Sequence, residues 1–154
     1  MSRAFVKEID DAPAEPVPER AISPHENVVT PRGAQLIREA LDAAAATLVA
    51  AVRPEERALA ARDLRYWHAR AATMRVVPQE TAPEAIGFGV TARVRRDGRI
   101  QDLTIVGEDE ADPAHGRIAW TSPLAEALDG AEIGEVVEFE AGGRVQAIEV
   151  MSLS

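Results

Sequence analysis

Residues 103–128 read LTIVGEDEADPAHGRIAWTSPLAEAL, and their pattern decides the fold of the second half of the chain. Apolar and β-branched residues at 103–106 predict a strand. An acidic loop at 108–113 separates it from a second predicted strand at 117–121. Ser122 is a good helix N-cap and proline follows it at the first helical position, so a short helix should complete the unit.

The sequence on either side of this unit has the alternation typical of further strands. Asp97-Gly98 predicts a tight hairpin turn, and Gly142-Gly143 predicts another. We therefore expect an antiparallel α+β domain over residues 87–154, with about five strands and one short helix. The flanking strands are expected at 88–95, 100–106, 135–139 and 144–150.

The first half of the chain predicts two helices. Thr30 is suited to cap the first helix, and Arg53-Pro54 separates it from the second, because proline disfavours helical geometry in the residue before it. Apolar residues recur at alternating spacings of three and four, the pattern of a coiled-coil seam. We expect an antiparallel coiled-coil hairpin over residues 31–76. The seam comprises Ala34, Ile37, Leu41, Ala44, Leu48 and Ala51, then Ala60, Leu64, Trp67, Ala71 and Met74.

Two segments are expected to lie outside these domains. Residues 1–30 are rich in proline and acids and predict a disordered or extended arm, whose one apolar cluster is Ala4-Phe5-Val6. Residues 77–86 contain two prolines and predict a linker between the hairpin and the α+β domain.

Composition restricts the class of protein. The absence of cysteine excludes disulfides and thiolate metal sites. The chain has neither an apolar run near the ~20 residues of a membrane helix nor a signal peptide, so we expect a cytoplasmic protein. The net charge of −9 argues against duplex-DNA binding by the whole molecule.

The charge is nevertheless unevenly distributed. Residues 32–75 hold eight arginines against five acids, whereas residues 84–154 hold six arginines against fourteen acids. Such asymmetry can orient a molecule on a partner that carries both signs of charge. Arginines that merely solvate a helical hairpin explain it equally well.

Several motifs, in this order, resemble the GreA/GreB family of transcription elongation factors. VTPRGAQLIREAL at 29–41 precedes a second helix ending in RVV, and IVGEDEAD at 105–112 precedes SPLAEAL at 122–128. The resemblance covers roughly Val29 to Val150. It implies an FKBP-like fold for the C-terminal domain, and RNA polymerase as the partner, entered by the hairpin through its secondary channel.

The tip of the hairpin departs from the family. In the family, two acids at the hairpin tip help hold the polymerase's catalytic magnesium and so drive cleavage of backtracked RNA. Magnesium is a hard cation that prefers oxygen ligands. The motif Gly-Asp-Leu-x-Glu-Asn is absent here, and Asp63-Leu64 resembles part of it ~12 Å beyond the tip. The hairpin is also shorter than the family's by ~11 Å. The tip residues are Arg53, Pro54, Glu55 and Glu56, whose two acids are explained as partners of the helix dipole.

A second family site is matched in part. The family's C-terminal domain grips a coiled coil at the channel rim through Asp-Ser-Pro. Ser122 and Pro123 match this motif, and Thr121 replaces the aspartate, so a charged contact is lost. The same pair is also an ordinary helix start. A basic face of the second helix is either a partner surface or simply exposed helix: Arg57, Arg62 and Arg65.

The acidic loop has the composition of a metal site. Glu108, Asp109, Glu110 and Asp112 lie near His115, but like charges repel unless an ion holds them, so we expect a solvated loop and no metal. Trp120 is expected in the core. Nucleophile and phosphate-cradle motifs are absent from the sequence, so we expect an interaction protein without a cofactor and not an enzyme.

These observations predict regulation of transcription elongation through RNA polymerase, without efficient stimulation of transcript cleavage, sequence-specific nucleic-acid contacts or membrane binding. One alternative is a regulator of nucleoside diphosphate kinase type, which shares this layout with a short hairpin. Another is a peptidyl-prolyl isomerase, although six aromatic residues hardly furnish the aromatic-walled pocket of those enzymes.

Overall fold

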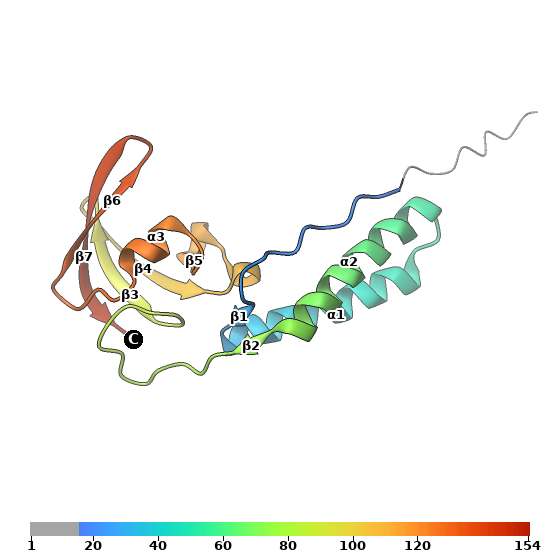
Figure 1. Cartoon of the computed structure of the whole chain (residues 1–154), viewed down its shortest axis with the longest axis horizontal. Coiled ribbons are helices and arrows are strands. Elements are labelled where there is room, and N and C mark those ends of the chain that lie inside the picture. Colours follow the sequence, from blue (N-terminus) through green and yellow to red (C-terminus); the bar gives the residue numbers. More distant parts are fainter. Residues whose placement is uncertain (1–15) are drawn as a thin grey trace, which may run out of the picture.

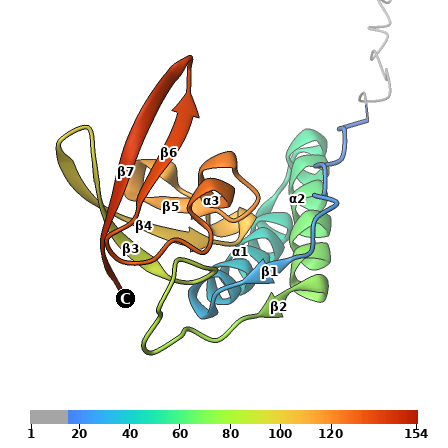
Figure 2. The ribbon, with the colours of Figure 1, turned by 60° about the vertical axis from the view of Figure 1, so that its left-hand side comes forward.

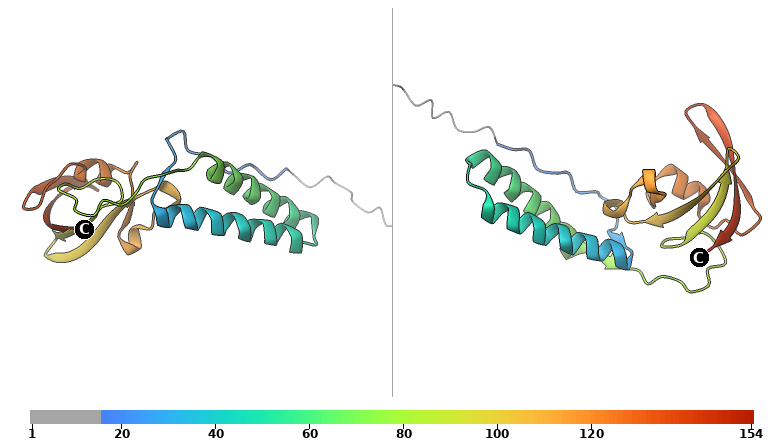
Figure 3. Two further views of the ribbon diagram at one scale, coloured as in Figure 1. Left: turned by 90° about the horizontal axis from the view of Figure 1, so that it is seen from below. Right: turned by 180° about the vertical axis from the view of Figure 1, so that it is seen from behind.

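The computed structural model describes residues 16–154, which form a helical hairpin and a β domain (Figure 1). The hairpin consists of α1, Pro31–Ala50, and α2, Pro54–Thr73. It projects from the β domain and does not lie flat across the sheet (Figure 3). Among residues 16–154, neither helix is long and apolar enough to cross a membrane. The apolar cluster at residues 4–6 lies outside the described part of the chain.

The two helices pack through small apolar side chains. Alanine removes little side-chain entropy on burial and allows helices to approach closely, so an alanine-rich seam suits a slender hairpin. At its base the seam widens, where Trp67 and Met74 pack against Ile37. The fully buried seam residues are all at expected positions: Ala34, Ile37, Ala44 and Ala60.

A small parallel sheet ties the two ends of the hairpin together. β1, Val28–Val29, pairs with β2, Arg75–Val76. Backbone hydrogen bonds of 2.9 Å extend this pairing to Asn27 and Val77. The sequence expectation of an arm up to residue 30 therefore needs correction, because residues 27–30 are buried parts of the fold. A two-residue strand is too short to produce an alternating pattern, which is why this pairing was not predicted.

The β domain is built on one five-stranded sheet, with the order β5-β4-β3-β7-β6. The pairs β3–β4, β3–β7 and β6–β7 are antiparallel, but β4 and β5 are parallel. The expectation of a wholly antiparallel sheet is therefore wrong at this edge, because the loop after β4 returns the chain in the same direction. The strands are β3 Thr91–Arg96, β4 Arg99–Val106, β5 Arg117–Ala119, β6 Val136–Ala141 and β7 Arg144–Leu153.

The short helix α3, Pro123–Leu128, covers one face of this sheet (Figure 2). The expected cap is present, since Ser122 Oγ accepts a hydrogen bond from the Ala125 amide at 3.3 Å. Leu128 is buried in the core beneath the helix. Ile86, at the end of the expected linker, is also buried there, so the β domain begins one residue earlier than its expected start at residue 87.

Candidate functional site

The acidic loop after β4 lies against the base of the helical hairpin. Its acids form a short 3-10 turn, Glu108–Glu110. Two glycines allow the close approach: a Cβ on Gly107 would lie 2.5 Å from the Val28 carbonyl oxygen, and one on Gly33 would lie 2.7 Å from Glu110 Oε2. Both distances are shorter than real side chains accept, so the two parts meet where the chain has no side chain to obstruct them.

Asp109 joins the loop to α2. Its carboxylate accepts a hydrogen bond from Arg70 Nε and another from the Tyr66 hydroxyl, each at 2.5 Å. Arg70 is only 2% exposed, and its Nη2 also donates to Asn27 Oδ1 at 2.8 Å. Burial, followed by the hydrogen bond to Asp109, raises the pKa of Tyr66 to about 12.

Glu110 joins the loop to α1. The Thr30 hydroxyl donates to Glu110 Oε2 at 2.5 Å, while Thr30 Oγ1 accepts from the Gly33 amide at 2.9 Å. Thr30 therefore caps the helix and binds the β domain with one hydroxyl group. Arg32 Nη1 adds a hydrogen bond to Glu110 Oε1 at 3.2 Å.

Glu108 completes the contact by binding both the N-terminal segment and the β domain. Its Oε1 accepts hydrogen bonds from Ser23 at 3.0 Å and from Thr121 at 3.2 Å. The expectation of a solvated acidic loop is thus wrong: its first three acids, here called the clasp (Glu108, Asp109 and Glu110), accept hydrogen bonds from donors in distant parts of the chain. Within residues 16–154 the structure has no group of ligands suited to a metal ion.

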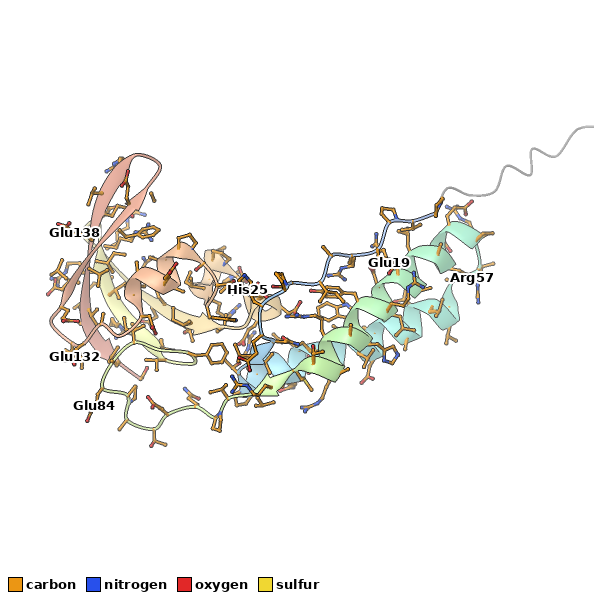
Figure 4. The ribbon with its side chains drawn as sticks, viewed as in Figure 1. Glu19, His25, Arg57, Glu84, Glu132 and Glu138 are labelled. Carbon is orange, nitrogen blue, oxygen red and sulfur yellow. The ribbon has the colours of Figure 1, made fainter. Side chains whose placement is uncertain are left out.

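The expected rim-binding residues lie beside the clasp, at the start of α3. Thr121 and Ser122 are already engaged, the first with Glu108 and the second as helix cap, whereas Pro123 is exposed. Of the three, Thr121 lines an open groove of about 680 Å³ between α3, Phe88 and the N-terminal segment. His25 enters this groove where that segment passes between helices and β domain (Figure 4).

Trp120 lines the same groove, which the sequence alone did not indicate. The indole packs against the core, as expected, and meets the His25 ring edge-on with centroids 5.9 Å apart. Its Nε1 is buried and has no hydrogen-bond partner among the described residues. Most buried donors in proteins are hydrogen-bonded, so this N–H is an exception within the wall of the groove.

The expected tip residues lie at the far end of the hairpin. Arg53 is the N-cap residue of α2. The Glu56 carboxylate accepts a hydrogen bond from the Arg53 amide at 3.4 Å and forms an ion pair with the Arg53 side chain at 3.3 Å. Pro54 and Glu55 are exposed in the first turn. Val49 and Val52 are 86% and 84% exposed beside them, so the tip is apolar as well as charged.

The arginines of the expected basic face of α2 are all bonded to other groups of the chain. Arg62 pairs with Asp63 at 2.8 Å, and Arg57 donates to the Ala51 carbonyl at 3.2 Å. Arg65 is held by Glu19 of the N-terminal segment, which runs along α2 (Figure 4). The hydrogen bond from Arg65 keeps the pKa of Glu19 below its usual value.

The sequence of the second half of the chain is similar to sequences of transcription elongation factors. Residues 80–154 match the family model described as transcription elongation factor, GreA/GreB, C-term. The chain is 38% identical over 73 residues to transcription elongation factor GreA of Maricaulis maris, covering 46% of each chain. It is 39% identical over 75 residues to GreA of Bacillus cereus strain AH187, covering 49% of this chain and 48% of that protein. The match thus spans about half the length of these relatives.

A solved structure, GreA factor homolog 1 of Thermus thermophilus, aligns with 84% of this chain and 99% of its own at a TM-score of 0.42 and 17% identity. The identification therefore rests on the sequence matches. They define the second half of this chain as a domain of the kind found in transcription elongation factors. Residues 80–154 are thus similar to the C-terminal domain of the GreA/GreB family, the resemblance that their motifs predicted.

Proposed function

We propose that this protein regulates transcription elongation by binding RNA polymerase, with its hairpin directed into the secondary channel. The observation that carries this proposal is the clasp, which fixes a projecting hairpin to a Gre C-terminal domain through buried, charge-assisted hydrogen bonds. A hairpin held at one angle enters a pore without losing orientational freedom at that step. The names of the relatives, transcription elongation factors, support the same role.

The C-terminal domain supplies the docking surface in this proposal. The groove beside Thr121, Ser122 and Pro123 receives a segment of the channel rim, which packs against the Trp120 ring that lines it. The carboxylate that the family places at position 121 is replaced by a threonine already bonded to Glu108. Docking on this surface therefore depends on shape and on contact with the indole ring more than on charge.

The hairpin occupies the channel without driving RNA cleavage. Magnesium coordination in trans by the family's pair of acids needs two free carboxylates at the tip, and with Glu56 engaged by Arg53 the tip offers only the exposed Glu55. In this proposal the protein acts in the cytoplasm as a binding factor and not as an enzyme. Its FKBP-like C-terminal domain serves to dock it on the polymerase. It competes with cleavage factors for the channel.

The experiment is a competition assay on purified, backtracked elongation complexes. The full chain should displace a cleavage-competent factor and slow its RNA cleavage, while producing no cleavage alone. A pull-down from cell extract tests the alternative partner, since recovery of a nucleoside diphosphate kinase without polymerase subunits would contradict the proposal. A proline-isomerisation assay on a model peptide should show no acceleration.

A further inference from the structure

A basic depression lies at the end of the sheet remote from the helices. It is lined by residues from the ends of the β3–β4 and β6–β7 hairpins, which are neighbours through the pairing of β3 with β7. The two turns use left-handed backbone, with φ of 51° at Asp97 and 59° at Gly142, which brings each pair of strands to a tight end. The depression is about 680 Å³ in volume, and its lining is Arg96, Asp97, Arg99, Gln101, Arg144 and Gln146.

The strand register places these side chains on one face. Val94 and Ile148 point into the core, and side chains two residues further along a strand point the same way. Arg96 pairs with Ile148 and Arg99, so all three share the inner face of the sheet. Arg144 and Gln146 precede Ile148 by four and two residues and share it too. The inner face thus continues past the core as a polar, arginine-lined surface.

The arginines of this depression differ from the others in their pairing. Among residues 16–154, ten of fifteen arginines are ion-paired with a carboxylate of the chain. Of the five that are not, three lie here, at 96, 99 and 144. Only one acid, Asp97, lines the depression. A concentration of uncompensated positive charge in an acidic protein is an attractive site for an anion.

One arginine is already positioned. Arg96 Nε donates to Gln146 Oε1 at 2.5 Å, and its guanidinium carbon lies 6.0 Å from the centre of the Phe139 ring. Because Gln146 accepts through its oxygen, its amide nitrogen remains a donor. Glu138 and Glu140 alternate with Phe139 along β6 and therefore lie on the opposite face of the sheet.

We propose that this depression binds phosphate groups, carried either by a nucleotide or by the backbone of single-stranded RNA. Guanidinium forks match phosphate oxygens in a bidentate manner, and the amide donor of Gln146 adds a neutral contact. A volume of about 680 Å³ is in the range of sites for nucleotide-sized ligands. This proposal concerns a surface remote from the groove at Trp120 and is independent of polymerase binding.

The test is isothermal titration calorimetry on the full chain at low salt, which measures the dissociation constant for inorganic pyrophosphate and, separately, for a short single-stranded RNA. Arg99→Glu should weaken binding at least about tenfold, because it removes a charge-assisted hydrogen bond and places a negative charge beside the phosphate. Arg38→Glu is the matched control, because Arg38 is also exposed and has no carboxylate partner among residues 16–154. It should leave the affinity within about twofold of the wild type.

The two probes distinguish the source of the phosphate. Binding of pyrophosphate indicates a nucleotide site, and binding of RNA alone indicates recognition of the backbone. Failure of both probes, or equal weakening by both variants, would overturn the proposal. Binding of a poly-glutamate peptide without binding of either phosphate probe would overturn it too.

Discussion

Arg70 Nε and Asp109 Oδ2 lie 2.5 Å apart, and this contact joins helix α2 to the loop that follows β4. Both side chains are nearly buried, at 3% and 9% exposure. Because Asn27 and Tyr66 bind the same pair, the contact is a network and not an isolated bridge. It sets the angle at which the hairpin leaves the β domain.

Removing one partner of this pair should be costly. We predict that Arg70→Met destabilises the protein by about 3–5 kcal/mol, because the Asp109 charge stays buried without its cation. Urea unfolding followed by circular dichroism measures the change. The control is Arg93→Met, which breaks the exposed pair with Asp102 and should barely move the unfolding midpoint. Equal effects of the two substitutions would contradict a special role for the clasp.

The close approach at Gly107 gives a steric prediction. Gly107→Ala places a Cβ 2.5 Å from the Val28 carbonyl oxygen, a backbone atom that cannot turn away. We expect a loss of about 1–3 kcal/mol, as for overpacked sites. Gly87→Ala is the control, since nothing lies within 4 Å of its Cβ position. Thermal unfolding of the two variants should therefore differ, and matching melting curves would count against the packing described.

The chain's single tyrosine reports on the clasp through its ionisation. Burial and the hydrogen bond to Asp109 raise the pKa of Tyr66 to about 12, above the ordinary value of about 10. The neutral phenol is thus favoured by folding. Its stabilising contribution is complete below pH ~10 and is lost as the pH rises through the folded-state value.

Absorbance of tyrosinate against pH measures this shift, with circular dichroism confirming that the samples remain folded. Half-ionisation should fall near pH 12 in the folded chain and near pH ~10 in urea. Asp109→Asn should lower the folded value. A folded chain that titrates like the unfolded one would show that Tyr66 is not bound as described.

Trp120→Phe separates binding from stability. The substitution keeps most of the ring and removes a buried N–H that has no partner among the described residues, so stability should be unchanged or up to about 1 kcal/mol higher. Affinity for RNA polymerase should fall about tenfold, because the smaller ring offers less contact surface in the groove; fluorescence anisotropy with labelled polymerase measures it. Trp67→Phe makes the same change at the hairpin base, outside the groove, and should leave affinity unaltered. An equal loss in both variants would remove Trp120 from the binding surface.

The elements that form through local rules could be read from the sequence. The start of α3 is decided by Ser122 and Pro123, and the break between α1 and α2 by Pro54, all within one helical turn. The turn at Asp97-Gly98 needs left-handed backbone, which these residue types supply. In each case the residue and its structural consequence are neighbours in the chain.

The clasp could not be read in this way. Asp109 is hydrogen-bonded to Arg70, which lies thirty-nine residues away in the sequence, and Glu108 is hydrogen-bonded to Ser23, which lies eighty-five residues away. A run of acids looks like a solvated loop until the fold brings these donors to it. The parallel pairing of β5 has the same origin, since three residues carry no sign of the direction in which they pair. The groove at Trp120 was missed because core packing explains a tryptophan equally well.

The most direct test of the central claim is the RNA-cleavage assay on backtracked polymerase, run with the full chain and with Glu55→Gln/Glu56→Gln. Both proteins should bind with similar affinity, compete with a cleavage factor and leave the RNA intact. Robust cleavage by the unmodified chain that the double substitution abolishes would contradict it, and so would failure of the unmodified chain to bind polymerase.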